Sequence, residues 1–206
     1  MIRPAGFVWN QTREIGFFPV TETWYNNGYF EASERNAKSS LSPALNLFRK
    51  TLANKYTRGG AGIVLDFGSG YGEFIARRSN TIGFDICEKA ARKLKDAGLF
   101  FDPYLNDLDQ REIEAVTFFD VIEHLLDPQI ILERIRSQYV IVSIPIFRDE
   151  AHILGSKHFK IQEHYWYFTA KSFREYMANL DFRLIEARDD ETKIGREDII
   201  THVFKR

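Results

Sequence analysis

The chain has 206 residues, of which 44% are hydrophobic and 28% charged, and it contains 18 phenylalanines. This composition suits one domain with a large core and excludes a disordered chain. The 28 basic residues almost cancel the 29 acidic residues. The balance disfavours general nucleic-acid binding, although it leaves room for a local basic patch.

The sequence also bears on the location of the protein. Cys87 is the single cysteine, so an internal disulfide cannot form, as is usual in a reducing compartment. No apolar run approaches about 18 residues, and the N-terminus lacks the apolar stretch of a signal peptide. We therefore expect a soluble cytoplasmic protein without a membrane span, either a monomer or a homodimer.

The first part of the chain carries aromatic and polar residues without a clear period up to about residue 40. Ser42-Pro43 then offers a helix start, with proline at the first helical position. Apolar residues follow at spacings of three and four as far as Tyr56, which predicts a helix. We expect residues 1–57 to form an N-terminal helical and aromatic cap segment, and residues 58–206 to form the main domain.

Apolar runs and helical stretches alternate through the middle of the chain. Runs at 62–67, 81–86, 115–121 and 139–146 are apolar on both faces, as in the strands of a covered parallel sheet. Helical patterns lie between them, over 88–97 and from Asp127 to Ile135. This alternation predicts βαβ units and an α/β, doubly wound, mostly parallel sheet.

The end of the chain changes character. Thr169 caps an expected helix, and strand-like runs follow at 182–187 and 198–204. A connection of only about ten residues is too short for a parallel crossover. We therefore expect an antiparallel C-terminal strand pair.

The stretch IVLDFGSGYGEF, residues 63–74, places glycines directly after the first strand of the alternating region. It matches neither a phosphate loop nor a dinucleotide fingerprint, and a diphosphate would be repelled by Asp66 and Glu73. A cationic ligand without phosphate, such as S-adenosylmethionine, suits these carboxylates better. Asp85 follows Asp66 by 19 residues, the distance at which a carboxylate can bind ribose hydroxyls.

At this point the sequence resembles the class I S-adenosylmethionine-dependent methyltransferases, in particular the ubiquinone-biosynthesis-like (methyltransferase type 23/11) subgroup. Six segments carry the resemblance in order, from about residue 60 to the C-terminus. They are LDFGSGYGEF (65–74), GFDI (83–86), LNDLD (105–109), EAVTFFDVIEHLLDP (114–128), VSIP (142–145) and EHYWYFTAKSFREYM (163–177). The resemblance implies a Rossmann-like sheet of seven strands and a main domain, 58–206, that binds the methyl donor.

The resemblance also implies a role for particular residues around S-adenosylmethionine and its product, S-adenosylhomocysteine. The residues expected to bind the cofactor are Asp66, Gly68, Ser69 and Gly70 at the methionine end, Asp85 and Ile86 at the ribose, Asn106, Asp107 and Leu108 at the adenine, and Phe118 and Phe119 near the sulfonium. In the family the segment before this domain usually covers the acceptor.

Two histidines are the candidates for catalysis. His164 lies among aromatic residues ahead of the Thr169 helix, and His124 follows the fourth predicted strand; each has packing in the core as an alternative role. His152, His158 and His164 are six residues apart, which suits neither a helix face nor the usual zinc spacing. The sequence therefore predicts no metal site.

The resulting hypothesis is methyl transfer from S-adenosylmethionine to an oxygen, nitrogen or carbon atom of a small-molecule acceptor. Two alternatives stay open. The first is a catalytically silent partner or regulatory domain that binds S-adenosylmethionine. The second is a sugar- or cap-directed nucleic-acid methyltransferase, although the D/N-P-P-Y/F/W motif of enzymes that methylate base amino groups is absent after the fourth strand.

Overall fold

The computed structural model describes residues 3–20, 27–106, 108 and 112–206. Its strands are β1 (Val8–Asn10), β2 (Ile15–Phe17), β3 (Ile63–Phe67), β4 (Thr81–Phe84), β5 (Ile113–Phe119), β6 (Tyr139–Phe147), β7 (Trp166–Thr169), β8 (Arg183–Arg188) and β9 (Ile199–Lys205). Its α-helices are α1 (Asn27–Ala37), α2 (Ser42–Tyr56), α3 (Glu73–Arg77), α4 (Glu88–Asp96), α5 (Gln129–Leu132), α6 (Glu150–Gly155), α7 (Ala170–Ala178) and α8 (Asp190–Lys193). Short 3-10 turns occupy η1 (Arg58–Gly60) and η3 (Ile122–His124).

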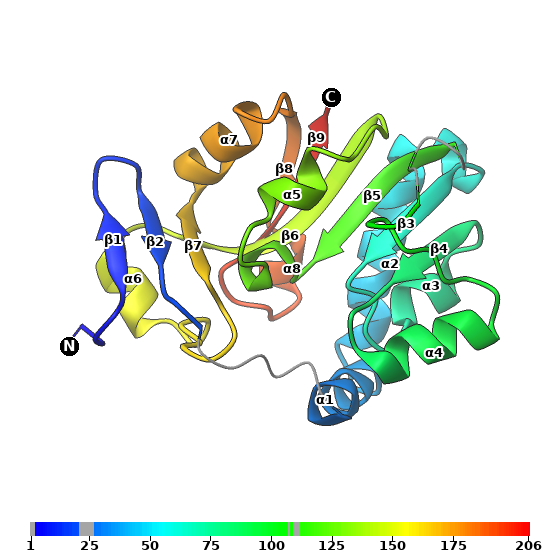
Figure 1. The fold of residues 1–206 in the computed structure, drawn as a ribbon, viewed down its shortest axis with the longest axis horizontal. Coiled ribbons are helices and arrows are strands. Elements are labelled where there is room, and N and C mark those ends of the chain that lie inside the picture. Colours follow the sequence, from blue (N-terminus) through cyan, green and yellow to red (C-terminus); the bar gives the residue numbers. More distant parts are fainter. Residues whose placement is uncertain (1–2, 21–26, 107, 109–111) are drawn as a thin grey trace.

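The central sheet runs in the order β4-β3-β5-β6-β9-β8 (Figure 1). Strands β4, β3, β5 and β6 are parallel, whereas β9 is antiparallel to both β6 and β8. The chain reverses its direction of winding at β3, because β4 lies on one side of it and β5 on the other. The predicted Rossmann-like, doubly wound, mostly parallel sheet with an antiparallel C-terminal pair is therefore confirmed.

The number of strands differs from the expected seven. Beyond β4, Phe100 forms only a single parallel bridge, with Gly83. A second group of strands, β1-β2-β7, instead continues from the end of β6 through two pairs, Ile146 with Phe168 and Phe147 with Thr169. These strands have only three or four residues, which is too short to show an alternating pattern, so they were not predicted.

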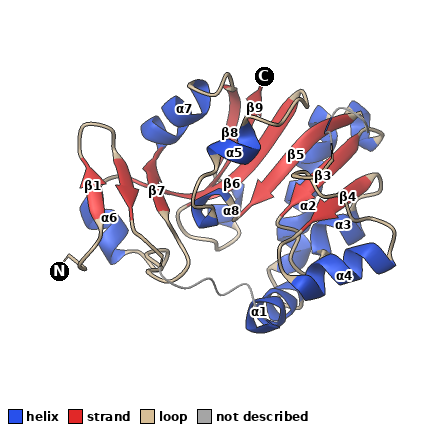
Figure 2. Cartoon of the chain, in the orientation of Figure 1, coloured by secondary structure: helices blue, strands red, loops and turns tan. Residues whose placement is uncertain are grey.

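Apolar side chains fill both faces of the central sheet. One face packs against α5 and α7 through residues such as Phe118, Leu132 and Phe173. The opposite face is covered by α2 and α3, where Leu52 and Phe74 contact the sheet (Figure 2). Strands with both faces buried explain why the predicted runs were apolar throughout.

Helix α7 begins where the sequence predicted. Thr169 and Ser172 form a reciprocal capping box, in which each side chain bonds the other residue's backbone N–H. Among the described helices, none has the length and apolar character needed to cross a membrane.

Candidate active site

The glycine turn connects β3 to α3 at the carboxyl end of the sheet. Gly68 has a φ of +77°, and a Cβ atom there would lie 2.5 Å from Cγ2 of Val121. The backbone N–H groups of Gly68 and Ser69 both donate to the carbonyl oxygen of Phe84, at 2.8 and 3.1 Å. The turn is thus fixed to the end of β4, and only glycine fits its closest approach.

Asp85 lies at the end of β4 with its carboxylate held by backbone amides. Oδ2 accepts from the N–H of Gly70 at 2.7 Å, and Oδ1 accepts from the N–H of Cys87 at 2.8 Å. Burial raises the pKa of this carboxyl group, and these backbone bonds oppose the rise. Each carboxylate oxygen can accept a further hydrogen bond. Asp85 therefore remains able to bind hydroxyl groups in the small cavity that it lines.

Asp66 lies at the end of β3, beside the glycine turn, and lines a larger cavity. Its Oδ1 accepts a hydrogen bond of 2.7 Å from the hydroxyl of Thr117 on β5. Burial raises the pKa of Asp66 to about 7, although the Thr117 bond and the charge of Arg49 oppose the rise. A cation placed against this carboxylate would favour its ionised form.

Two cavities open at this edge of the sheet. The larger has a volume of about 700 Å³ and the smaller about 40 Å³. Four residues line both: Tyr29, Gly68, Asp120 and His124. These residues mark the junction between the Asp85 end and the larger cavity.

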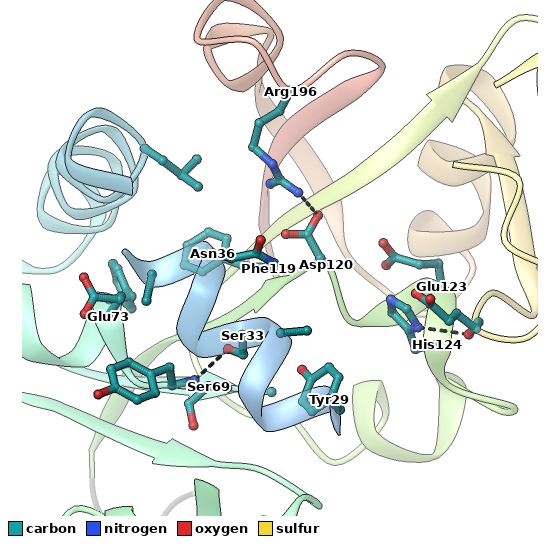
Figure 3. Close-up of a pocket in the computed structure, with 18 of the residues that line it drawn as sticks. Tyr29, Ser33, Asn36, Ser69, Glu73, Phe119, Asp120, Glu123, His124 and Arg196 are labelled. Carbon is teal, nitrogen blue, oxygen red and sulfur yellow. Dashed lines mark hydrogen bonds and ion pairs between the residues drawn. The ribbon is translucent and has the colours of Figure 1, made fainter. Parts of the chain in front are cut away.

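Helix α1 covers the glycine turn, a contact that the sequence did not predict (Figure 3). The hydroxyl of Ser33 accepts a hydrogen bond of 2.8 Å from the backbone N–H of Tyr71. A Cβ atom on Gly70 would lie 2.4 Å from this hydroxyl, so the helix packs directly on the turn. Residues 27–37 have no apolar period, so this helix could not be predicted from the pattern.

Three charged residues, Arg49, Asp120 and Arg196, line the larger cavity, and the fully buried Glu191 joins them in one network. Arg49 binds Glu191 at 2.9 Å and Asp120 at 3.2 Å, and Arg196 binds Asp120 at 2.9 Å (Figure 3). Burial opposes ionisation of Asp120, but the charges of Arg196 and Arg49 outweigh it and lower the pKa of Asp120 well below its ordinary value. The backbone of Asp120 has a φ of +60°, a strained conformation that the two arginines help to maintain. Nothing in the sequence linked these residues, because they are far apart along the chain.

The two candidate histidines are in contact with each other and also line the larger cavity. Their rings lie 4.5 Å apart at an angle of 88°. Nδ1 of His124 is 2.9 Å from the carbonyl oxygen of Glu163. Burial lowers the pKa of His124 to about 4. The pKa of His164 lies well below its ordinary value because the ring is buried and because His124 is its neighbour. Both rings are therefore neutral at pH 7 and neither is a strong base.

Some of the remaining predicted cofactor residues line a cavity and others do not. Ile86 is exposed and lines the small cavity, and Phe119 lines the larger one. Phe118 is fully buried in the core with its ring 5.1 Å from that of Phe67, so it lines neither cavity, contrary to the expectation. Neighbouring side chains on a strand point to opposite faces, and here Phe119 is the one that reaches the site.

Of the expected adenine-side residues, Asn106 and Leu108 line neither cavity. Asn106 uses its side-chain amide to bind the carbonyl oxygen of Asp102 at 2.9 Å. The side chain of Leu108 is buried in the core instead of lining a pocket. Asp107 lies outside the described residues.

The strand order, the glycine turn after β3 and the buried acid at the end of β4 together define a class I S-adenosylmethionine-dependent methyltransferase. The profile of a family described as "Methyltransferase domain" matches residues 33–187. This match covers most of the chain, and the protein belongs to that family. The resemblance to the class I S-adenosylmethionine-dependent methyltransferases is confirmed, and with it S-adenosylmethionine as the cofactor and S-adenosylhomocysteine as its product.

Solved structures share the fold at low sequence identity. A SAM-dependent methyltransferase from Archaeoglobus fulgidus is 17% identical, with a TM-score of 0.61 over 86% of this chain and 100% of that one. The Burkholderia thailandensis 1,6-didemethyltoxoflavin-N1-methyltransferase, with that compound and S-adenosylhomocysteine bound, is 14% identical, with a TM-score of 0.57 over 98% of this chain and 99% of that one.

A chain in the Haloferax volcanii complex of the methyltransferase activator Trm112 with a methyltransferase is 14% identical, with a TM-score of 0.61 over 87% of this chain and 94% of that one. No curated protein matches the sequence significantly. These likenesses concern the fold.

Proposed function

We propose that this protein transfers the methyl group of S-adenosylmethionine to a small-molecule acceptor. The observation that carries the proposal is the meeting of two cavities at Gly68, Asp120 and His124. The smaller cavity lies against Asp85 and the larger, of about 700 Å³, is of the size usual for small-molecule sites. A donor bound along the glycine turn would then direct its methyl group into the larger cavity.

The residues along the glycine turn fit the donor chemically. The hydroxyl oxygen of Ser69 is buried and has no hydrogen-bond partner among the described residues. It can donate to the carboxylate of the methionine part, while Asp66 faces its α-amino group and Asp85 accepts from the ribose hydroxyls. The unpartnered hydroxyl is a cost to the unliganded protein that donor binding would remove.

Donor binding requires α1 to move. The cavity beside Asp85 holds about 40 Å³, room for a few water molecules and much less than a nucleoside. Tyr29 on α1 lines this cavity, and Ser33 ties the same helix to the glycine turn. We infer that α1 opens for the donor and closes over it, which would exclude water from the site.

The chain assists the reaction mainly by alignment and by excluding water. The bound donor supplies an electrophilic methyl group whose positive charge is lost in the transition state, which favours a dry site. The neutral rings of His124 and His164 and the arginine-bound carboxylate of Asp120 are all weak bases. We therefore assign His124 and His164 to the acceptor wall, and assign most of the rate acceleration to positioning of the acceptor.

Donor binding is the first test of the proposal. We expect titration calorimetry to give micromolar affinity for S-adenosylhomocysteine, reduced at least tenfold by Asp85→Ala and by Ser69→Ala. Ser69→Ala removes an unpartnered group, so it leaves stability intact even if Asp85→Ala does not. Asp96→Ala, at an exposed position on α4, is the matched control. Equal affinity in all four proteins would reject these assignments.

Transfer itself is tested by incubating the protein with a metabolite extract and a donor labelled at the methyl group. A labelled small molecule that requires the intact Asp85 side chain supports the proposal. Label only in added RNA or added protein would point to a macromolecular acceptor and overturn the small-molecule assignment. Tight donor binding without any labelled product would favour the silent binding partner instead.

A further inference from the structure

Glu123, His124 and His164 form a cluster in the wall of the larger cavity. Glu123 and His124 belong to the turn η3 that follows β5 (Figure 3). His164 lies just before β7. Two hydrogen bonds hold the two segments together. The N–H of Tyr165 donates to the carbonyl oxygen of Glu123 at 2.8 Å, and His124 Nδ1 bonds the carbonyl oxygen of Glu163 at 2.9 Å. The cluster is thus fixed by its backbone rather than assembled from mobile side chains.

Two atoms of this cluster are buried without a hydrogen-bond partner in the described part of the chain. They are Oε2 of Glu123 and Nδ1 of His164, and the two residues are only 1% and 3% exposed. Buried polar atoms are nearly always paired, because leaving one unpaired costs about 1–3 kcal/mol. Two such atoms in one cluster of residues that line a cavity indicate a missing partner that can bind both an oxygen and an imidazole nitrogen.

We propose that Glu123, His124 and His164 bind a divalent transition-metal ion such as Zn²⁺, Mn²⁺, Fe²⁺ or Co²⁺. One ligand atom from each side chain lies within 4.8 Å of the other two. Bonds of about 2.1 Å in a tetrahedral site place ligand atoms about 3.4 Å apart, so small side-chain rotations suffice. Two imidazoles and one carboxylate suit these ions better than Mg²⁺ or Ca²⁺, which prefer oxygen ligands throughout.

The surroundings of His124 support this assignment. A carbonyl oxygen only accepts hydrogen bonds, so the bond to Glu163 places the ring proton on Nδ1 and the lone pair on Nε2. A backbone carbonyl in this role is the usual way in which a ligating imidazole is oriented. The spacing argument that predicted no metal considered His152 and His158, which instead bind Asp198 and the carbonyl of Glu197.

The site has a consequence for the proposed methyl transfer, on which this step rests. Three protein ligands leave coordination positions open, and all three residues line the larger cavity. An acceptor hydroxyl bound to the ion would lose its proton to solvent more readily. Its oxygen then forms the bond to the methyl carbon, while the electron pair of the S–CH₃ bond stays on sulfur. The acceptor class is therefore one that presents a hydroxyl oxygen, for which the weakly basic histidines alone are poorly suited.

Metal binding can be tested without any acceptor. The full chain, stripped with a chelator, is titrated with Co²⁺ while the visible absorption of the ion is followed, and with Zn²⁺, Mn²⁺ and Mg²⁺ by calorimetry. We expect one equivalent of transition metal to bind, with weaker binding of Mg²⁺. Glu123→Gln and His164→Gln should each weaken binding at least tenfold, whereas the control His152→Gln, outside the cluster, should not.

The variants distinguish the site from its alternatives. Glu123→Gln removes a buried carboxyl without changing the size of the side chain, so the protein stays folded, as circular dichroism will check. Binding that is lost in both cluster variants supports the proposal. No binding of any of the four ions at millimolar concentration, or equal binding in all variants, overturns it. Metal binding without methyl transfer would leave the site standing and reject only the enzymatic proposal.

Discussion

Replacing Asp66 with asparagine tests how strongly the cavity disfavours an ionised carboxylate before the donor binds. Burial raises the pKa of Asp66 from an ordinary 3.8 to about 7, against the hydrogen bond from Thr117 and the charge of Arg49. The folded protein therefore holds a proton that the unfolded chain releases between these two pH values. Stability is lost as the pH rises through this window, and the loss is complete above about pH 7.

The magnitude follows from the difference between the two pKa values. From 3.8 to about 7 is about three pH units, which at about 1.4 kcal/mol per unit corresponds to about 4 kcal/mol. Asp66→Asn keeps an oxygen that can accept from Thr117 and cannot ionise. Relative to the wild type, we expect it to stabilise the unliganded protein by an amount that grows between pH 4 and pH 7 and then levels off.

Urea denaturation at several pH values measures this difference directly. Asp96→Asn, at an exposed position on α4, serves as the control and should show no such trend. The Asp66→Asn variant should bind S-adenosylhomocysteine with an affinity that no longer rises with pH around 7. A stability difference that is the same at pH 4.5 and pH 8 would refute the reasoning, because it would mean that the cavity does not perturb Asp66.

Three further substitutions have consequences that a denaturation or binding curve can show. Gly68→Ala places a Cβ atom 2.5 Å from Val121 at a φ of +77°, so we expect the free energy of unfolding to fall by about 2 kcal/mol. Adding Val121→Ala should recover part of this loss, and an unchanged melting temperature of the Gly68→Ala variant would contradict the prediction. Arg49→Met leaves the buried carboxylate of Glu191 short of a partner and should cost about 3–5 kcal/mol in urea denaturation, whereas a neutral effect would show that the network is not needed for stability. Ser33→Ala removes the hydroxyl that ties α1 to the glycine turn, so stopped-flow fluorescence should show faster donor association; an unchanged rate would argue against a moving α1.

The parallel part of the central sheet could be predicted from the sequence because β3, β4, β5 and β6 are apolar on both faces and each is followed by a recognisable helix or turn. Asp85 and the glycine turn could be predicted for a related reason, since the end of a strand fixes where its next residue lies. Hairpin β1–β2 escaped prediction because its strands have three residues each and its side chains do not alternate clearly.

The charged network and the histidine cluster could not be derived from local patterns. Arg49 and Glu191 are 142 residues apart, and their contact depends on how α2 and α8 pack on the sheet. The sequence does place Glu123 and His124 shortly after one strand, which is a typical position for residues of a site, and His164 shortly before another. The sequence did not show that hydrogen bonds between the two segments bring them together, and the spacing argument considered His164 only with His152 and His158.

Strand β6 belongs to two sheets at once, because most of it pairs with β5 and β9 while its last two residues pair with β7. Different strands consequently hold the two parts of the cavity walls. The turn that we propose as the donor site is anchored on β3 and β4, whereas the segment ahead of β7 lines the larger cavity and not the smaller one. Insertions or sequence exchanges in the N-terminal hairpin and in the β6–β7 connection should alter which acceptor is methylated without changing how the donor is recognised. Chimeras with related proteins, joined within β6, are therefore a practical route to new acceptor specificity.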